Sequence, residues 1–466
     1  MTANGEEAYE QIIREGLGRT GAPSTVLILG GGMAGLTAAD VLVRAGHDVT
    51  IVEAQTRVGG RVQTFREPFS EGLFAEAGAM RIPKTHRLTR AYIERFGLST
   101  VPFTMNNPRG YVRLMGSQKR AEDYHLDDPV MARWEAALAP LLERIERDGE
   151  AGWEAVEAAN DHYSLREFLE VSGFSENDIE VLSLLTGMEP LLNTAFMEVV
   201  REEQGKWFTD VDTIEGGMDR LPKAFLPSLK GRIRFGARVC RIEEKASGVE
   251  VTCESAAGTT RYAAARVIVT LPFGVLRHIE IVPGLSREKE RAIRQLNYDA
   301  STKILLQCRR RFWEEDDGII GGATVTDLPI RSMYYPDQGR ETGRGVILAS
   351  YTWAQDAERW ASLEPHRRLE EAIENVALIH PQILQEFEAG AVKVWQEDPF
   401  ACGAFALFEA GQQTLLYADI IRAEGRLHFA GEHASLAHAW IQGAIESGLR
   451  AAVEVHEAAG QGRATS

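Results

Sequence analysis

Residues 25–54, TVLILGGGMAGLTAADVLVRAGHDVTIVEA, decide the fold of this 466-residue chain. The continuous apolar run TVLIL predicts a strand that is buried on both faces. From Met33 to Ala45 the apolar residues recur at helical spacing, and Gly46 stands where a helix C-cap belongs. DVTIVEA predicts a second strand. Strand, helix and strand in this order are typical of a Rossmann-like α/β domain.

Three glycines, Gly30, Gly32 and Gly35, form a GxGxxG pattern between the first strand and the helix. Gly30 permits a tight turn, Gly32 lets the backbone approach a pyrophosphate, and Gly35 lets the helix pack close to the strand. The helix N-terminus then offers free N–H groups and a positive dipole to phosphates. Glu53 ends the second strand, where its carboxylate can accept both ribose hydroxyls. The predicted dinucleotide contacts in this unit are Gly30, Gly32, Met33, Ala34, Gly35, Glu53 and Ala54.

Composition and charge argue against several classes of protein. The chain has 51 basic and 68 acidic residues and a formal charge of −17, which argues against nucleic acid or an anionic membrane surface as a partner. The cysteines form no CxxC pair and have no histidine cluster beside them, so neither a zinc site nor a disulfide framework is expected. We see no signal-peptide pattern and no apolar run near the roughly 20 residues of a membrane span. We therefore expect a cytoplasmic protein.

The remaining chain divides into stretches of different periodicity. Residues 6–16 predict a short helix ahead of the first strand. Residues 120–205 carry long helical periodicities, whereas strand patterns return from residue 230. Residues 300–400 mix strands with one clear helix, HRRLEEAIENVALI. The length favours several domains. We predict a discontinuous nucleotide-binding domain (24–66, 214–295 and 421–460), a mixed-sheet substrate domain (70–118 and 300–420) and a helical domain (120–205).

A second glycine pair follows Glu53 in the sequence RVGGRVQT, which contains Gly59, Gly60 and Arg61. Here the chain resembles the flavin amine oxidase family, and within it the L-amino-acid oxidases. The resemblance implies a monoamine-oxidase-like fold and FAD as the cofactor, with both glycines and Arg61 at the FAD pyrophosphate. The alternative is a surface turn with a solvated arginine, which the preceding Glu53 disfavours.

The C-terminal sequence agrees with this resemblance. FAGEH, followed by AWIQGAIESGLRAA, is similar to the closing motif of the family. The similarity implies that Glu432, next to Gly431, binds the ribityl chain or the pyrophosphate region. It also implies that backbone near Ile441 and Gln442 reaches the flavin pyrimidine ring, where a helix N-terminus would stabilise the charge of reduced flavin. The backbone of Val239 matches the position that meets adenine.

The segment EAGAMR, residues 76–81, gives the strongest indication of the substrate. It is similar to a Gly-x-Met-Arg segment of the L-amino-acid oxidases, in which the arginine binds the substrate carboxylate. Arg81 suits this role because its planar guanidinium binds a carboxylate through two hydrogen bonds. The alternative is an ion pair between Arg81 and Glu76 or another acid. The resemblance also assigns Gly78, Ala79, Met80 and Arg81 to the cofactor site.

Further matches come from the second half of the chain. Residues 303–336 resemble the L-amino-acid oxidases almost residue by residue, and Lys303 matches a lysine that holds a water against flavin N5. The alternative is a strand-end lysine that reaches solvent. Trp440 resembles one wall of the aromatic cage of the family. Trp395 and Phe405 are expected to line the side-chain pocket, although aromatic residues are by default part of the core.

Two positions depart from the family pattern. The tyrosine expected beside the substrate carboxylate falls on Ser350, with Tyr351 next, and neighbouring residues of a strand face opposite sides. Either a bulge shifts the strand, or Tyr351 has another role and Arg81 another helper. The cysteine that binds flavin covalently in some members is replaced by Gly403, one residue after Cys402. We therefore expect non-covalent FAD.

Together these features predict a flavoenzyme that oxidises L-amino acids with O2 to 2-oxo acids, ammonia and hydrogen peroxide. Large neutral side chains are expected to be favoured, and the enzyme is expected to be a homodimer. One alternative is an amino-acid monooxygenase of the same family, which yields an amide. Another, from a different class, is a flavin-binding scaffold without turnover. The expected catalytic residues are Arg81, Lys303, Tyr351, Phe405 and Trp440.

Overall fold

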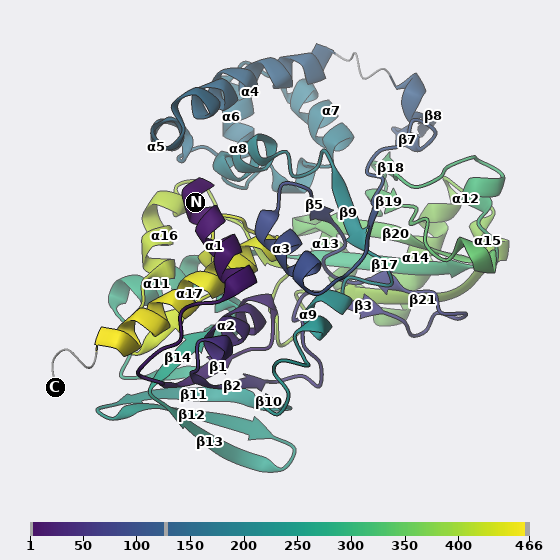
Figure 1. Ribbon diagram of the computed structural model, residues 1–466. Helices are drawn as coiled ribbons and strands as arrows, with labels where there is room; N and C mark the ends of the chain where they lie inside the picture. Colours follow the sequence, from purple (N-terminus) through teal and green to yellow (C-terminus); the bar gives the residue numbers. More distant parts are fainter. Residues whose placement is uncertain (1–2, 125–128, 462–466) are drawn as a thin grey trace.

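The computed structural model describes residues 3–124 and 129–461. Residues 125–128, part of the predicted helical domain, lie outside these ranges. The fold is a mixed α/β arrangement of several sheets and many helices, which confirms the predicted fold class (Figure 1). A helical group occupies the top of the view, a mixed sheet the right, and the nucleotide-type sheet the lower centre.

A parallel sheet with strand order β10-β2-β1-β14-β23 forms the centre of the molecule. Its strands are β1 (Thr25–Leu29), β2 (Asp48–Glu53), β10 (Ile233–Phe235), β14 (Arg266–Val269) and β23 (Leu427–Phe429). In chain order this is 3-2-1-4-5, the doubly wound order in which ligands bind where the order reverses, between β1 and β14. The sheet therefore gathers strands from three distant parts of the sequence.

Strand β1 is buried on both faces, as its apolar run predicts. Val26 and Ile28 pack into the core on one side, and Leu27 and Leu29 pack into the core on the other. On the first side lie the helices α1 (Ala3–Glu15), α2 (Met33–Arg44), α3 (Arg87–Arg95) and α17 (Ile441–Gln461). Helices α2 and α17 approach closely, because a Cβ on Gly448 would lie 2.5 Å from the Ala34 carbonyl oxygen.

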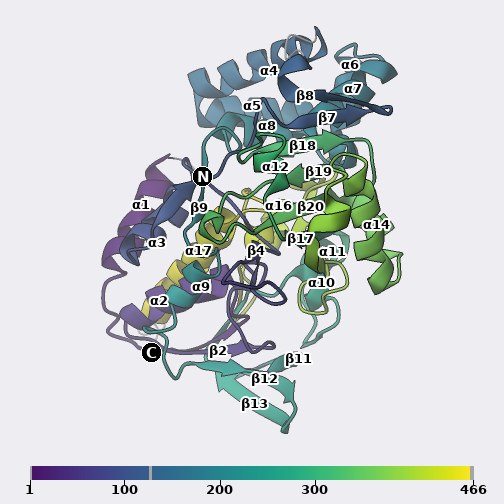
Figure 2. The same cartoon turned by 90° about the vertical axis from the view of Figure 1, so that its right-hand side faces the viewer.

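A four-stranded sheet lies below the parallel sheet in both views (Figures 1 and 2). Its order is β13-β12-β11-β15. The strands are β11 (Arg238–Lys245), β12 (Gly248–Ser255), β13 (Gly258–Ala264) and β15 (Glu280–Val282). Val239, near the start of β11, is thereby brought beside the end of β2.

A mixed sheet of order β21-β17-β20-β19-β18-β7-β8 forms the second large unit. Its strands are β7 (Tyr111–Leu114), β8 (Ser117–Arg120), β17 (Ser301–Cys308), β18 (Ala323–Thr326), β19 (Ser332–Tyr334), β20 (Gly345–Trp353) and β21 (Phe387–Val394). The sequence predicted one clear helix in this region, α14 (Pro365–Ala377). The structure adds α12 (Phe312–Glu315), α13 (Ala354–Ala361), α15 (Ile383–Glu386) and α16 (Gln412–Ile421), most of them too short for their periodicity to be recognised.

The pairing of β17 with β20 contains a register shift between Ile304 and Leu305. Leu305 pairs with Leu348, whereas Ile304 pairs with Ser350, so Ala349 is an extra residue in β20. The shift places Tyr351 opposite Lys303. This is the bulge that the sequence left open as one explanation of the Ser350–Tyr351 departure.

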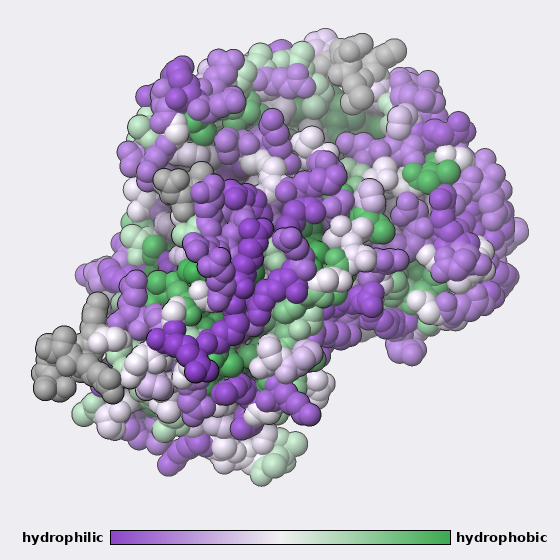
Figure 3. All heavy atoms as spheres, viewed as in Figure 1, coloured by the Kyte–Doolittle hydropathy of each residue, from purple (hydrophilic) through white to green (hydrophobic). Residues whose placement is uncertain are grey.

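The helical group consists of α4 (Pro129–Asp148), α5 (Glu150–Asn160), α6 (Leu165–Val171), α7 (Glu176–Thr186) and α8 (Phe196–Gly205). Capping boxes at Ser164 and Ser175 fix the starts of α6 and α7. The group has its own core, in which Phe168 and Phe196 stack with ring centroids 3.6 Å apart. It adds no strand to the parallel sheet. Most of the face seen in Figure 3 is hydrophilic, and apolar residues gather beneath α4 and α7.

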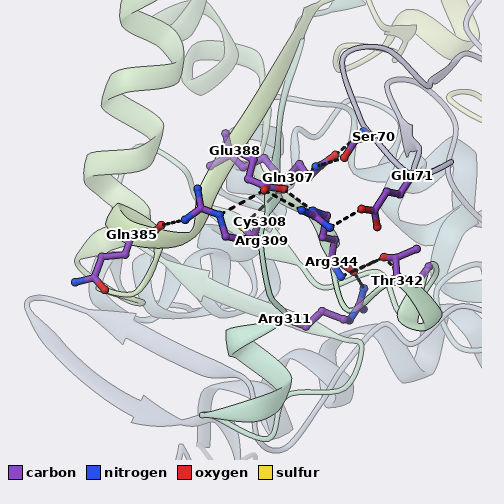
Figure 4. A network of polar contacts seen from close by, with 12 residues as sticks. Ser70, Glu71, Gln307, Cys308, Arg309, Arg311, Thr342, Arg344, Gln385 and Glu388 are labelled. Carbon is purple, nitrogen blue, oxygen red and sulfur yellow. Dashed lines mark hydrogen bonds and ion pairs between the residues drawn. The ribbon is translucent and has the colours of Figure 1, made fainter.

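A polar network fastens the loop around Ser70 to the mixed sheet (Figure 4). Gln307 on β17 donates to Ser70 Oγ at 2.7 Å and to Glu388 Oε2 at 2.9 Å. Arg344 donates to Glu388 at 3.0 Å and to Glu71. The loop that leads into residues 76–81 is thus held against the sheet that carries Lys303.

Short elements complete the described chain. They are β3 (Thr64–Phe65), β4 (Ala75–Glu76), β5 (Ile82–Pro83), β6 (Thr100–Pro102), β9 (Val211–Ile214), β16 (Tyr298–Asp299), β22 (Phe405–Ala406), α9 (Arg220–Ala224), α10 (Phe273–Leu276) and α11 (Arg287–Gln295). Among residues 3–124 and 129–461, no helix combines the length and the apolar character needed to cross a membrane.

Candidate active site

A cavity of about 1570 Å³ runs between the parallel sheet, the mixed sheet and the helical group. Small-molecule pockets usually measure about 300–1,000 Å³, so this cavity has room for a nucleotide and a second ligand. The predicted site residues that line it are Gly30, Gly32, Met33, Ala34, Glu53, Ala54, Gly59, Gly60, Arg61, Gly78, Ala79, Met80, Arg81, Val239, Lys303, Tyr351, Trp395, Phe405, Gly431, Glu432, Trp440 and Ile441.

Gly35 requires a correction, because it lies behind the cavity wall. A Cβ at this position would lie 2.1 Å from the Gly30 carbonyl oxygen and 3.2 Å from Ile28 Cγ2. The predicted direct contact between Gly35 and the cofactor is therefore replaced by the packing of α2 against β1.

The N-terminus of α2 opens on the cavity. Gly32 caps the helix with an extended backbone and no side-chain hydrogen bond, so the first N–H groups of α2 have no side-chain cap. A Cβ on Gly32 would meet no atom within 4 Å. Gly59 N donates to Gly31 O at 2.8 Å, which brings the second glycine pair beside the first. Both motifs thus form one cradle of backbone around an open space.

Glu53 lies at the end of β2 on the edge of this cradle. Its carboxylate accepts hydrogen bonds from Gly31 N at 2.7 Å and Gln55 N at 2.8 Å. A carboxylate has about four acceptor sites, so two remain for a ligand. Burial raises the pKa of Glu53, and the two backbone hydrogen bonds oppose that rise.

Arg61 and Glu432 form an ion pair that joins the two ends of the chain. Arg61 Nη1 donates to Glu432 Oε1 at 2.8 Å and to Ala404 O at 3.0 Å. Glu432 also accepts from the backbone N–H groups of Ala406 and Ala439, each at 3.1 Å. The pair fixes the loop that leads into α17, whose N-terminus at Ile441 faces the cavity.

These features fit the FAD that the sequence resemblance implies. The cradle at Gly32 is open, and the carboxylate of Glu53 keeps acceptor sites for a ribose. The N-termini of α2 and α17 both face the cavity and suit phosphates and a reduced flavin ring. Arg61, Val239 and Trp395 would complete the cofactor wall.

Arg81 is a buried cation in the same cavity, with 8% of its surface exposed. Nη1 donates to Met105 Sδ at 3.0 Å and approaches Tyr334 Oη at 3.5 Å, and the guanidinium lies 5.1 Å from the centroid of the Phe208 ring. No described carboxylate forms an ion pair with it. Burying an unpaired charge is costly, so Arg81 needs an anionic ligand.

Glu76 is not the partner of Arg81. Its carboxylate accepts from Met218 N at 2.9 Å and from Thr64 Oγ1 at 2.8 Å. Burial raises the pKa of Glu76 to about 7. The proposed alternative of an Arg81–Glu76 ion pair is therefore not what the structure contains.

Lys303 points inward from β17 and does not reach solvent, since only 2% of its surface is exposed. Its Nζ donates to Gly78 O at 2.6 Å and to Glu76 O at 3.3 Å, and it lies 4.5 Å from the centroid of the Tyr351 ring. Burial, and secondarily the charge of Arg81, lowers the pKa of Lys303 to about 7. Lys303 thus brings the Gly78 segment and the mixed sheet together.

Tyr351 faces the cavity, whereas Ser350 faces the core. Ser350 is fully buried and donates to Ile330 O at 3.2 Å. Tyr351 lines the cavity beside Lys303, and burial raises the pKa of its hydroxyl. Tyr334 on β19 is a second phenol beside Arg81. Sequence reasoning missed it, although it lies within residues 303–336, which resemble the L-amino-acid oxidases.

Aromatic side chains enclose the space beside Arg81. Trp440 contacts His86, Trp207 and Phe208, with ring centroids 5.0, 5.8 and 5.4 Å away. On the opposite strands, the rings of Tyr351, Trp353 and Phe405 follow one another along the lining. Trp395 is a buried wall residue that donates to Ala77 O at 2.9 Å.

Glu202 on α8 is a cavity residue that the motifs do not reveal. Trp440 Nε1 donates to Glu202 Oε1 at 3.2 Å. Burial raises the pKa of Glu202 to about 7. In the sequence Glu202 stands in EEQ on a helix, a pattern typical of a solvated face. The one available signal is its spacing of four residues from Glu198, which places both carboxylates on the same face of the helix.

No cluster of His, Cys, Asp or Glu within residues 3–124 and 129–461 has the arrangement of a metal site.

A model of the flavin-containing amine oxidoreductase family matches residues 33–456. YobN of Bacillus subtilis (strain 168), provisionally named an L-amino-acid oxidase, is 40% identical over 96% of this chain and 97% of its own. An L-amino-acid oxidase of Siganus canaliculatus is 35% identical over 96% of this chain and 88% of its own.

Two solved structures of amine-named oxidases share this fold. Putrescine oxidase bound to putrescine superposes with a TM-score of 0.76 at 20% identity, covering 93% of this chain and 99% of that chain. Cyclohexylamine oxidase from Brevibacterium oxydans superposes with a TM-score of 0.77 at 19% identity, covering 94% of this chain and 99% of that chain. At this identity the likeness concerns the fold alone.

Proposed function

Because the chain belongs to the flavin-containing amine oxidoreductase family, we propose that it oxidises the α-amino group of free L-amino acids. The family makes it a flavin-dependent oxidase with FAD as its cofactor. The proposed products are a 2-oxo acid, ammonia and hydrogen peroxide. The observation that supports amino acids as the substrate class is the buried guanidinium of Arg81, which has no carboxylate partner among the described residues.

An amino acid supplies the anion that Arg81 needs. Its α-carboxylate can accept two hydrogen bonds from the planar guanidinium. The hydroxyl of Tyr334, 3.5 Å from Arg81 Nη1, is near enough to add a further donor, and Tyr351 lines the same cavity. A simple amine brings no carboxylate and would leave the charge of Arg81 uncompensated.

The chain contributes mainly orientation and exclusion of water. When bound, FAD supplies the acceptor for the hydride that leaves the α-carbon. Arg81 fixes one end of the amino acid, and Trp440 and Tyr351 limit its position on either side. Holding the reacting groups in this way lowers the entropic part of the barrier. Lys303 adds a buried cation on the other side of the Gly78 segment.

We propose that FAD is held without a covalent bond. Gly403, at the position where covalent members of the family carry cysteine, has a φ of +140°, and a Cβ there would lie 2.9 Å from Tyr298 Cβ. Cys402 is half-buried and lines the cavity. Acid precipitation should give a colourless pellet and a yellow supernatant. A yellow pellet would mean that Cys402 forms a bond to the flavin.

Large neutral side chains are the proposed preference. The lining near Arg81 is rich in aromatic rings, including Trp353 and Phe405, and continues along α4 with Met131, Trp134 and Leu138. Such a surface favours apolar side chains through burial, at about 25 cal/mol per Å². It sets no sharp upper limit on their size.

A peroxide-coupled screen of the twenty L-amino acids tests the function. The set should include the D-enantiomers of the best substrates, and putrescine and cyclohexylamine as amines without a carboxylate. We expect turnover of L-amino acids with large neutral side chains and little turnover of the amines. Equal turnover of the amines would refute the role of Arg81.

Product analysis of the same reactions separates the two oxidative alternatives. A 2-oxo acid with stoichiometric peroxide supports the oxidase, whereas an amide with loss of carbon dioxide identifies a monooxygenase. Bleaching of the flavin by an amino acid without oxygen excludes a scaffold that lacks turnover.

We further propose a cytoplasmic homodimer. All four cysteines are free thiols in the structure, which suits a reducing compartment. Cell fractionation tests the location, and light scattering coupled to size exclusion tests the oligomer.

A further inference from the structure

Helix α8 presents two carboxylates, one turn apart, to the loop before α17. Glu198 is fully engaged, because it accepts from His438 Nδ1 at 2.7 Å and Phe408 N at 3.0 Å and pairs with Arg201 at 3.2 Å. Glu202 accepts only from Trp440 Nε1, at 3.2 Å. Its second oxygen has no hydrogen-bond partner among the described residues.

The other carboxylates of the cavity lining are occupied or lie at exposed positions. Glu53 and Glu432 accept backbone N–H groups, and Glu189 pairs with Arg331 at 2.6 Å. The exposed acids are Glu122, Glu135 and Glu203. Among the described residues, Glu202 is therefore the enclosed carboxylate of the cavity that has one oxygen without a hydrogen-bond partner.

The groups that face Glu202 come from several elements. Arg81, which follows β4, acts on it with a positive charge, and Glu198 and Glu203 of α8 act with negative charges. Tyr351 on β20 is close enough for the charge of Glu202 to act on its hydroxyl. Burial raises the pKa of Glu202 to about 7, against the lowering effect of the Trp440 hydrogen bond and of Arg81. Near neutral pH this carboxylate can therefore both hold and release a proton.

We propose that Glu202 takes the proton from the α-ammonium group of an amino acid whose carboxylate is bound by Arg81, an inference that rests on the proposed function. One N–H bond of the ammonium breaks and one O–H bond forms on the carboxylate, so the amine lone pair becomes free and no net charge is created. The proton returns to solvent after the product leaves. Oxidation needs this lone pair, because the ammonium form cannot release a hydride from the α-carbon.

Substrate binding itself favours this transfer. The carboxylate of the amino acid neutralises Arg81, which otherwise stabilises the ionised form of Glu202. Removing that stabilisation makes Glu202 a stronger base at the moment the ammonium arrives. The bond from Trp440 holds one oxygen in place while the other receives the proton.

The test is the pH dependence of kcat/KM in Glu202→Gln, measured on L-leucine and L-phenylalanine. Glutamine keeps the carbonyl oxygen that accepts from Trp440 but takes up no proton. At pH 7 we expect kcat/KM to fall about 100-fold. The acid limb, near pH 7 in the wild type, should move up to the pKa of the substrate's own ammonium. Above that pH the two enzymes should converge, which a merely structural defect would not produce.

Two further variants keep the test interpretable. Glu154→Gln, at an exposed acid of α5 outside the cavity lining, should leave the profile unchanged. Trp440→Phe removes the donor to Glu202 and should shift the acid limb upward without abolishing it. Flavin content and thermal stability show whether each variant is folded.

The outcomes distinguish a failure of the proposed function from a failure of the role assigned to Glu202. If the wild type oxidises no L-amino acid at any pH, the proposed function is wrong. If Glu202→Gln is folded and active with an unshifted acid limb, or is slower by the same factor at every pH, the assignment of Glu202 is overturned. A loss confined to lysine and arginine as substrates would also overturn it, because Glu202 would then bind cationic side chains instead.

Discussion

The two ends of the cavity are built from different materials. At the cofactor end, the wall is mainly backbone: the glycines at 30–32 and 59–60 and the N-termini of α2 and α17. At the substrate end it is side chains from distant segments, among them Arg81, Lys303, Tyr351 and Glu202. Cofactor binding depends on open space beside the glycines, which an added Cβ atom would fill. The substrate end depends on charge, because the positive charge of Arg81 acts there on both Lys303 and Glu202.

This contrast predicts that added volume breaks the cofactor end. Gly35→Ala places a Cβ 2.1 Å from the Gly30 carbonyl oxygen, so we expect no folded, flavin-loaded protein. Gly32→Ala meets no protein atom within 4 Å and should fold normally. Its methyl group would occupy the cofactor's space and weaken FAD binding by roughly 10- to 100-fold. Melting curves of apoprotein and flavin titrations measure both effects, and unchanged FAD affinity in Gly32→Ala would contradict the cradle.

Removing charge should break the substrate end and spare the cofactor. We expect Arg81→Ala to lower kcat/KM for L-leucine by roughly two to four orders of magnitude, with FAD content unchanged. Arg81→Lys should recover little, because a point charge cannot replace the two-pronged guanidinium. Lys84→Ala, an exposed cation on the same segment, is the matched control. Near-normal kinetics of Arg81→Ala would refute the assignment.

Lys303 combines features of both ends, because its Nζ binds backbone of the Gly78 segment and can carry a charge. Lys303→Met should slow reoxidation of reduced flavin by roughly 10- to 100-fold and slow reduction by amino acid less, since a cation favours electron transfer to oxygen. The lowered pKa, about 7, means that the charged form is lost as pH rises through this value. Wild-type reoxidation should therefore slow above pH 7, whereas the variant should be insensitive. Stopped-flow measurements of flavin reduction and reoxidation test this role. An equal decrease in both rates, together with lower stability, would indicate a structural role.

The smallest effect is expected at the bulge of β20. Tyr351→Phe removes a hydroxyl from the cavity and should raise KM about 3- to 10-fold, the value of one hydrogen bond. Ser350→Ala changes a hydroxyl that faces the core, so we expect unchanged kinetics and a stability loss of about 1 kcal/mol. The reverse result would mean that the register shift is absent in solution.

The local structure at the cofactor end was predictable from the sequence because its motifs are local. The TVLIL strand, the GxGxxG turn and the closing FAGEH motif each specify their structure within a few residues, and the family resemblance is confirmed. The sequence offered the shift in β20 only as one of two alternatives, since GVILASYTW is buried on both faces and lacks the alternation that would fix its register. Tyr334 and Glu202 were missed for another reason: each reaches the site through tertiary contacts, and Tyr334 is 253 residues away from Arg81 in sequence.

Helix α8 also has a consequence for regulation from a distance. Its two carboxylates tie the helical group to His438 and Trp440, so the group cannot shift without moving the aromatic wall or breaking those bonds. A disturbance of the helical group from outside would therefore reach the aromatic wall through these two hydrogen bonds, although nothing enters the cavity.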